Sequence, residues 1–270
     1  MEKMEKTDTS DLAKTARLPE QAKVKSLYKA IQLLFYFSGE KKELGVTELA
    51  EKTGMLKSSV HNILATYEVC GIVERNPKTN KYRLGIRVLE LSNQFYHNND
   101  VRHVVRPIMD QVAEILGESV YLAVFHEKEI IYVDGAFPSI AVGRRNMTGI
   151  KAPAYCTGIG KALLAYQPEP VIEEIIEDGL KGFTKNTITD GRMLKRELAI
   201  IRRQGYAVDN MEHEYGIQCV AVPIFNREGK IVAAYSVSGP SPRFSEERIG
   251  QISELLKESA ETVKWQLSAD

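Results

Sequence analysis

The sequence has few cysteines and no long apolar run. Its three cysteines, Cys70, Cys156 and Cys219, are far apart, and an odd number without a Cys-x-x-Cys pair argues against a disulfide framework or a thiolate zinc site. The longest apolar stretches, such as Ile217–Phe225, are the length of a β-strand, whereas a bilayer crossing takes about 20 residues. Met1–Lys6 has no apolar segment behind it, as a secretory signal would. We therefore expect a cytoplasmic protein with no membrane partner.

The chain also lacks an excess of charge of either sign, because 36 basic side chains balance 36 acidic ones. The balance is uneven along the chain. Residues 22–85 contain eleven Lys and Arg but six Asp and Glu, so this segment carries +5 and the remainder carries −5. A basic segment joined to an acidic one is typical of a protein in which one end meets phosphate. The length of 270 residues indicates two domains.

The first part of the chain predicts a winged helix-turn-helix over residues 22–85. Residues 1–21 are polar without an apolar period and predict a disordered arm. The predicted elements are helices over Val24–Phe37, over Thr47–Lys52 with Thr47 as its cap, and from Ser58 or Ser59 to Val69, then strands over Ile72–Arg75 and Tyr82–Leu84. The polar loop 76–81 between the two strands would form the wing.

The rest of the chain predicts a linker helix and an α+β domain. Residues 86–104 form the linker, with a helical pattern over Arg87–Tyr96, and residues 105–270 form the second domain. Its predicted helices are Pro107–Leu116, Gly158–Tyr166, Glu169–Asp178, Asp190–Gln204 and Glu246–Trp265, and its predicted strands are Ser119–Phe125, Ile130–Gly135, Tyr206–Asp209, Gln218–Phe225 and Lys230–Ser238. Several antiparallel strands with helices alongside make an α+β fold.

The third predicted helix and the wing have the side chains that DNA recognition needs. A recognition helix carries short polar side chains near its N-terminus so that it can enter the major groove. The candidate DNA-binding residues are Lys57, Ser58, Ser59, His61 and Asn62 on the helix and Lys78, Lys81 and Arg83 on the wing. Asn62 suits an adenine edge, and the wing cations suit phosphates. Alternatively, Ser58 or Ser59 only caps the helix, and the charges are solvated surface residues.

A second set of residues predicts a cradle for a small carboxylate. Gly158 and Gly160 open a helix where free N–H groups favour an anion, and Ser236 and Ser238 lie two apart on a strand and share a face. The candidate effector-binding residues are Tyr155, Thr157, Gly158, Asp209, Cys219, Ser236 and Ser238, with Arg144 and Met147 as weaker additions. The structural alternatives are a small buried Cys219, an Asp209 that caps the following loop, and serines that pair across strands.

Two enzymatic interpretations are weaker. Cys156 beside a helix start suits a thiolate nucleophile, but neither His126 nor His213 is in a segment that points to it. Glu212-His213-Glu214 has successive polar residues, which rarely converge on one metal ion, and predicts a solvated loop. We therefore expect no catalytic residue, metal or cofactor. The alternative is a small-molecule or redox enzyme that uses Cys156 and carries a vestigial winged helix.

Several short motifs occur together in a fixed order. The N-terminal ones are Glu48–Ala50, Lys57–Thr66, Gly71–Arg75 and Tyr82–Gly85, and the more specific C-terminal ones are Cys156–Ala162, Gly205–Asp209, Gly216–Ala221 and Ser236–Pro240. In this order and spacing, from about Val24 onward, the chain resembles the IclR-type bacterial transcription regulators.

The resemblance implies a winged helix-turn-helix, a linker helix and a GAF-like effector domain. It implies homodimers or tetramers that bind palindromic operators in double-stranded DNA and respond to small organic or sugar acids. It also implies that Asp209, Cys219, Ser236 and Ser238 line the effector pocket. One departure is Asn62, which stands where the family often has Arg, and this leaves the operator sequence open.

Overall fold

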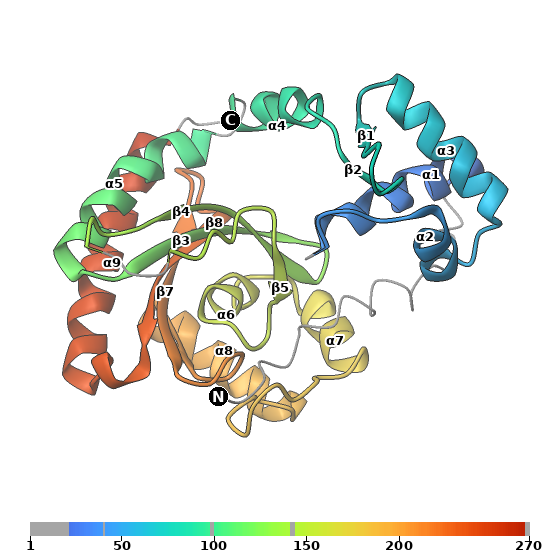
Figure 1. Ribbon diagram of the computed structural model, residues 1–270. Coiled ribbons are helices and arrows are strands. Elements are labelled where there is room, and N and C mark those ends of the chain that lie inside the picture. The colour runs from blue at the N-terminus through green and yellow to red at the C-terminus, as the bar shows by residue number, and fades with distance from the viewer. Residues whose placement is uncertain (1–21, 40, 98–99, 141–143, 268–270) are drawn as a thin grey trace. The chain divides into compact units, whose positions relative to one another are not determined.

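The computed structural model describes residues 22–39, 41–97, 100–140 and 144–267. The chain forms two compact units, residues 1–97 and 98–270, and each is described by itself (Figure 1). The boundary falls inside the stretch predicted as a linker. The predicted disordered arm, residues 1–21, lies outside the described residues.

The first unit is a winged helix-turn-helix. Its elements are α1 (Lys25–Phe35), the 3-10 turn η2 (Tyr36–Ser38), α2 (Val46–Thr53), α3 (Lys57–Val69), β1 (Val73–Arg75), β2 (Tyr82–Leu84) and α4 (Val88–His97). β1 and β2 are antiparallel, with Val73 opposite Leu84. The core of the unit consists of Leu33, Phe37, Leu44, Leu49, Ala50, Val60, Leu64, Val73 and Tyr82. Because β2 brings Tyr82 into this core, the wing is fixed to the helices.

Two helix starts differ from the prediction. α2 begins after Gly45 rather than after Thr47, because the carboxylate of Glu48 accepts the Gly45 N–H at 3.2 Å and completes the first turn. α3 begins after Leu56, and its cap makes no side-chain hydrogen bond. Neither Ser58 nor Ser59 therefore caps α3, so the structural alternative for these two serines is wrong.

The second unit is built on one six-stranded antiparallel sheet with the order β5-β4-β3-β8-β7-β6. The strands are β3 (Ser119–His126), β4 (Glu129–Ala136), β5 (Lys151–Pro153), β6 (Ala207–Asn210), β7 (Ile217–Phe225) and β8 (Ile231–Pro240). The helices are α5 (Asp100–Leu116), α6 (Gly158–Leu164), α7 (Glu169–Glu177), α8 (Gly191–Gln204) and α9 (Glu246–Gln266), with the 3-10 turn η3 (Ser241–Arg243) before α9. The α+β prediction is confirmed.

Each face of this sheet is covered by its own set of helices (Figure 1). Strand alternation sends Val220 and Val237 into a core beneath α5 and α9. It sends their neighbour Ala221 into a second core, with residues of α6, α7 and α8. The candidate effector residues lie on this second side, since Ser236 is directly opposite Ala221 in the register of β7 and β8.

α5 begins earlier than predicted and continues through Pro107, which the sequence pattern placed at its start. The reason is burial upstream of the proline: Val105 is fully buried, and Val101 and Val104 pack against the same core. This contact favours the helix over the break that an interior proline otherwise causes. β5 pairs with β4 and was not predicted, because three residues are too few for a visible alternation.

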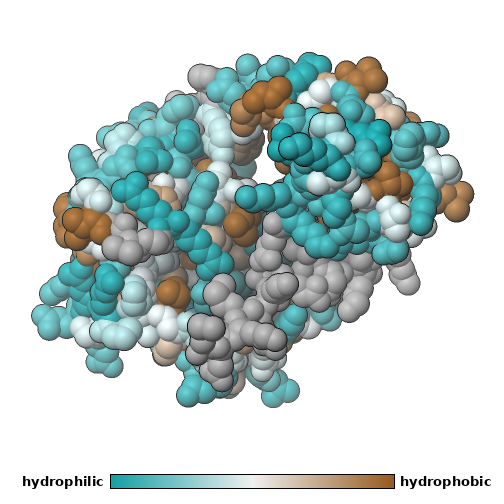
Figure 2. Space-filling model, in the orientation of Figure 1, coloured by the Kyte–Doolittle hydropathy of each residue, from teal (hydrophilic) through white to brown (hydrophobic). Residues whose placement is uncertain are grey.

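The surface in Figure 2 is mostly hydrophilic, with apolar residues in separate patches. In the first unit, Leu27 and Ile31 of α1 are exposed, and the buried residue of that helix is Leu33. Across the ranges that the structure describes, none of the helices combines the length and the apolar character that a bilayer crossing requires.

Candidate functional site

The predicted recognition helix presents a polar, solvent-facing side. Lys57, Ser58, His61 and Asn62 of α3 are exposed, and Ser59 is half-buried. The opposite side carries Val60 and Leu64, both fully buried. Because the apolar side is occupied by the core of its own unit, the polar side of α3 is available to an external partner.

The wing presents cations, some of which are already paired. Lys78 and Arg83 are exposed and Lys81 is half-buried. Arg83 forms an ion pair with Glu74, and Lys81 Nζ lies 3.4 Å from Glu48 Oε2. Exposed ion pairs of this kind are weak, so phosphate can compete for the same cations.

The wing loop is anchored to the body of the unit by Glu43, a residue that sequence reasoning missed. Its carboxylate accepts hydrogen bonds from Asn76 Nδ2 at 2.6 Å and from Thr79 Oγ1 at 2.8 Å. Asn76 Oδ1 in turn accepts the Lys78 N–H at 2.9 Å. The two contacts of Glu43 join positions more than 30 residues apart, so no local pattern indicates them.

Three candidate effector residues form a row across neighbouring strands. Asp209 of β6 is opposite Cys219 of β7, and Cys219 is opposite Ser238 of β8. The Sγ of Cys219 and the Oγ of Ser238 are 2.7 Å apart. Ser236 shares this face, because Val237 between the two serines points into the opposite core. The sheet therefore brings a carboxyl, a thiol and two hydroxyls to one side.

Gly158 lies directly against this row. A Cβ at Gly158 would be 3.3 Å from the Cβ of Cys219 and 3.5 Å from the Cβ of Asp209. The absence of a side chain therefore brings the backbone of the segment before α6 close to β6 and β7.

The donors at the start of α6 are fewer than predicted. Thr157 caps the helix, and its Oγ1 accepts the Gly160 N–H at 3.1 Å. The prediction of a free N–H at Gly160 is wrong because the preceding threonine already uses it. Thr157 itself is buried, as is Gly158.

Asp209 is buried and holds the loop that follows it, as its structural alternative proposed. Its Oδ1 accepts the Glu212 N–H at 2.7 Å. Burial is the main cause that raises the pKa of Asp209 from its ordinary 3.8 to about 7, and the charge of Glu212 acts in the same direction. This carboxyl therefore changes its charge near neutral pH.

A buried ion-pair cluster borders the row and was not predicted. Lys161 of α6 is 1% exposed, and its Nζ donates to Glu212 Oε1 at 2.5 Å and to Glu197 Oε1 at 3.1 Å. It also donates to the carbonyl of Val208 at 2.7 Å. The prediction that Glu212 belongs to a solvated loop is wrong, because the side chain turns inward to the ammonium of Lys161. Nothing in the local sequence around Glu212 indicates this partner, which lies 51 positions away.

Two tyrosines and an arginine lie beside the row. The rings of Tyr121 and Tyr132 are 5.7 Å apart, and Tyr121 donates its hydroxyl to the carbonyl of Arg145 at 3.1 Å. The guanidinium of Arg145 is 2.8 Å from Glu214. Burial raises the pKa of Tyr132, and the charges of Cys219 and Asp209 contribute to this shift. These residues were not among the candidates.

The remaining candidates of the second unit are less closely tied to the row. Tyr155 is buried, but its hydroxyl donates to the carbonyl of Lys181 at 2.8 Å. Arg144 is exposed and Met147 is half-buried. It is the neighbouring Arg145 that bonds Tyr121.

The environment of Cys156 does not favour a nucleophile. The side chain is fully buried, and burial, followed by the charges of Asp209 and Glu212, raises the pKa of the thiol. His126 is exposed, and His213 stacks on Phe183 with ring centroids 5.0 Å apart. Within the described part of the chain, no group of three or more His, Cys, Asp or Glu side chains is placed to hold a metal ion.

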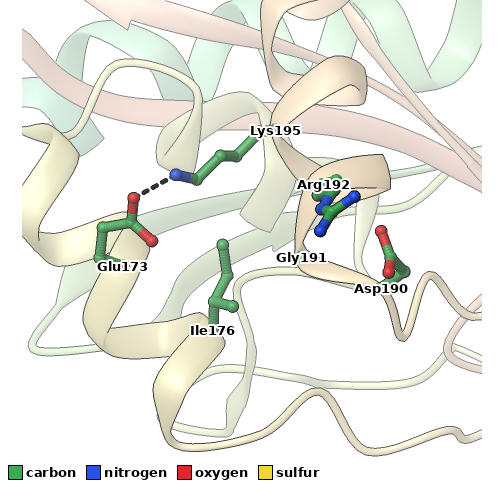
Figure 3. Close-up of a pocket in the computed structure, with 6 residues that line it drawn as sticks. All are labelled: Glu173, Ile176, Asp190, Gly191, Arg192 and Lys195. Carbon is green, nitrogen blue, oxygen red and sulfur yellow. Dashed lines mark hydrogen bonds and ion pairs between the residues drawn. The ribbon is translucent and has the colours of Figure 1, made fainter.

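Two surface hollows of the second unit lie elsewhere. One, of about 290 Å³, is lined by Glu173, Ile176, Asp190, Gly191, Arg192 and Lys195 of α7 and α8 (Figure 3). Lys195 points across it to Glu173 and also pairs with Glu169, so this cation is already compensated. The other, of about 430 Å³, lies on α5 beside the exposed Ile115. Neither includes a candidate residue.

Comparison with family models identifies both units. The model of the bacterial transcriptional regulator IclR C-terminal domain matches residues 93–265, and the IclR helix-turn-helix model matches residues 26–77. Among curated proteins, the HTH-type transcriptional regulator KdgR of Escherichia coli is 33% identical over 230 residues, which cover 85% of this chain and 88% of KdgR.

Solved structures agree with this assignment. An IclR transcriptional regulator from Alicyclobacillus acidocaldarius matches with a TM-score of 0.82 and 30% identity over 90% of this chain and 98% of its own. An IclR homologue from Microbacterium hydrocarbonoxydans complexed with 4-hydroxybenzoate matches with a TM-score of 0.77 and 26% identity over 90% of this chain and 98% of its own. The chain therefore belongs to the IclR family of bacterial transcriptional regulators.

Proposed function

We propose that this protein binds operator DNA through α3 and the wing and that a small organic acid bound in the second unit controls this binding. The observation that carries the proposal is that the two candidate binding surfaces lie in different units of one chain. The exposed polar side of α3 lies in one unit, and the row formed by Asp209, Cys219 and Ser238 is a feature of the other.

On the DNA side, Lys57, Ser58, Ser59, His61 and Asn62 contact the major groove, with Asn62 as the base-reading residue. Lys78, Lys81 and Arg83 contact phosphates and supply affinity rather than sequence preference. A homodimer or tetramer places two recognition helices on the inverted half-sites of a palindrome, one or more helical turns apart. The exposed positions of Lys57, His61 and Asn62 support this assignment.

On the effector side, Asp209, Cys219, Ser236 and Ser238 hold the carboxylate end of the acid, beside Thr157, Gly158 and Tyr155. Two hydroxyls on one face of β8 are suitable donors to an anion. The Microbacterium homologue was solved with 4-hydroxybenzoate, which supports a small acid as the effector class. Acid binding shifts DNA affinity through the linker, residues 86–104, by a coupling on the order of 1–3 kcal/mol.

We further propose that the protein acts in the cytoplasm and is not an enzyme. The raised pKa of the Cys156 thiol supports this, because a nucleophilic cysteine needs a lowered one. The rival interpretation, an enzyme using Cys156 with a vestigial winged helix, predicts no sequence-selective DNA binding.

The test is selection of duplexes from a random library with the full-length chain. Enrichment of an inverted repeat, with affinity that falls steeply as salt rises, supports the proposal. A thermal-shift screen of the chain with acetate, pyruvate, gluconate and 4-hydroxybenzoate tests the effector class. Failure to enrich any sequence favours the enzyme.

A further inference from the structure

The buried cluster next to the candidate effector site holds more carboxyl groups than cations. Lys161 is the buried ammonium, and two carboxylates, Glu212 and Glu197, share it. Asp209 lies three residues before Glu212, is 4% exposed, and has no ion-pair partner among the described residues. Three carboxyl groups therefore meet one ammonium, and two of them, Asp209 and Glu212, are almost completely buried.

The cluster also contains a buried acceptor without a donor. In the described part of the chain, Oε2 of Glu212 is buried and makes no hydrogen bond, although Oε1 is held by Lys161. Buried acceptors are normally satisfied. An unsatisfied oxygen beside a surplus carboxyl marks a cluster that can accept a proton.

The other groups around Asp209 do not compensate the negative charge that its buried carboxyl group would carry when ionised. Lys161 favours its ionised form, but this ammonium is committed to two glutamates. The backbone of His213 and that of Glu212 also favour the ionised form, while burial opposes it more strongly. Burial raises the pKa of the neighbouring thiols of Cys156 and Cys219 and of the phenol of Tyr132, so these groups stay neutral and leave the charge of Asp209 uncompensated.

An acid bound against the row would bring a further negative charge to this place. Cys219 and Ser238 lie in register with Asp209, so a carboxylate held by them approaches its carboxyl group. Two carboxylates in contact in a low-dielectric interior cannot both stay ionised, because their charges repel, and one of them takes a proton. Asp209 is the one that gains it, because Glu212 is paired with the ammonium of Lys161, whereas no ion pair holds Asp209 among the described residues.

We propose that binding of an acid in this unit is coupled to the uptake of one proton by Asp209, which then donates a hydrogen bond to the bound carboxylate. The proton comes from the solvent and ends on the carboxyl group of Asp209, and no other covalent bond changes. The proposal rests on the proposed function, since it concerns the same acid site. It makes the regulator respond to the product of acid concentration and proton concentration. Below neutral pH, less acid is needed for the same occupancy.

The proton on Asp209 has a test that needs no ligand. A carboxyl whose folded pKa is raised to about 7 stabilises the fold most at low pH, and this contribution is lost as pH rises through about 7. We expect the unfolding equilibrium constant of the wild type, relative to Asp209→Asn, to increase by roughly tenfold per pH unit between about pH 5 and 7. The single tryptophan, Trp265 of α9, reports unfolding of this unit.

Asp178→Asn is the matched control, because Asp178 is an exposed carboxylate after α7 whose partner is Lys128. It should keep the pH profile of the wild type. Glu212→Gln removes the nearest like charge and should move the Asp209 transition to lower pH. Parallel profiles of the wild type and Asp209→Asn would overturn the proposal, since Asp209 would then already be ionised in the folded chain.

Proton uptake itself is measured by calorimetric titration with whichever acid of the screen, acetate, pyruvate, gluconate or 4-hydroxybenzoate, stabilises the chain. The observed heat in HEPES and in Tris at about pH 8 should differ by the ionisation heat of nearly one proton per acid bound. The dissociation constant should increase about tenfold between about pH 6 and 8 in the wild type and stay level in Asp209→Asn.

The outcomes separate the two proposals. If no acid of the screen binds at any pH, the proposed function loses its effector and the coupling falls with it. If an acid binds with equal affinity at both pH values and without buffer-dependent heat, the acid site stands and the coupling alone is overturned. If Asp209→Asn binds no acid, the pH dependence of the wild type still decides between these results.

Discussion

The Nζ of Lys161 lies 2.5 Å from Oε1 of Glu212, and both side chains are almost completely buried. The contact joins α6 to the loop between β6 and β7, from which Glu212 donates its N–H to Asp209. Burial alone lowers the pKa of Lys161, but Glu212 and Glu197 outweigh this and raise it, so the ammonium stays charged. The candidate effector site is therefore built against an internal salt bridge.

Lys161→Met should be strongly destabilising. Removal of one partner leaves Glu212 and Glu197 without their cation and the Val208 carbonyl without a donor. Breaking a buried pair in this way costs about 3–5 kcal/mol. Urea unfolding followed by Trp265 fluorescence measures it. Lys195→Met is the matched control, because Lys195 is half-exposed and its loss should cost at most about 1 kcal/mol. Equal effects of the two variants would show that the Lys161 pair is not buried.

Gly160→Ala should destabilise the second unit by about 1–3 kcal/mol or more. A Cβ there would lie 2.4 Å from Thr157 Oγ1 and 2.6 Å from the Ala154 carbonyl oxygen, and backbone cannot move aside cheaply. Gly250→Ala in α9 is the control, since a Cβ at that position meets nothing within 4 Å. It should stabilise the chain by about 0.5–1 kcal/mol through helix propensity. Thermal melts of both variants give the comparison, and a neutral Gly160→Ala contradicts the packing.

Glu48→Gln should remove a pH-dependent part of the stability of the first unit. Hydrogen bonds from Lys41 and from the Gly45 N–H, together with Lys81, lower the pKa of Glu48 to about 2. A lowered pKa stabilises the fold above the ordinary value of 4.5, and this contribution is lost as pH falls towards about 2.

Hydrogen exchange of α2 and the wing, measured on both chains, should therefore converge as pH falls from about 5 to 2. Glu51→Gln, on the exposed side of the same helix, is the control and should follow the wild type. A constant difference between Glu48→Gln and the wild type across this range would contradict the role of the carboxylate.

Ser236→Ala should abolish the response to acid while the affinity for operator DNA is kept. Ser236 is buried on the face of β8 that carries Ser238, and it belongs to the second unit, whereas α3 and the wing belong to the first. Ser253→Ala is the matched control: this serine is equally buried, but in α9 beneath the opposite face of the sheet. Thermal shift with acid and fluorescence anisotropy with DNA test both variants. An acid that stabilises Ser236→Ala as much as the wild type would exclude Ser236 from the site.

The sequence predicts most of the fold because its elements carry local patterns. The period of Val60 and Leu64 in α3, and the alternation of Val220 and Ala221 in β7, both match the burial in the structure. Helix starts were less predictable. The predicted cap of α2 was Thr47, but the helix begins after Gly45, whose N–H donates to the Glu48 carboxylate, and this contact exists only once the turn has folded. α5 shows the same limit, because burial of Val105 outweighs the proline two residues later.

The candidate site was predictable where strand register determines it, and it was not predictable where the interacting residues are far apart in the sequence. The shared face of Ser236 and Ser238 follows from a two-residue spacing, and their register brings Cys219 alongside. Lys161 and Glu212 carry no local pattern, because 51 residues separate the two charges and only the packing of α6 against β6 joins them. Long-range ion pairs of this kind are visible only in three dimensions.

The most direct test of the account is fluorescence anisotropy of the full-length chain on the duplex selected from the random library, with and without the stabilising acid. The account predicts that Lys57→Ala weakens binding and that Lys78→Ala, which removes a phosphate contact, reduces the salt slope by about one, whereas Lys230→Ala in the β7–β8 turn changes neither. It predicts that the acid shifts the affinity by about 5–150-fold. Binding that is indifferent to Lys57, to salt and to the acid would contradict it.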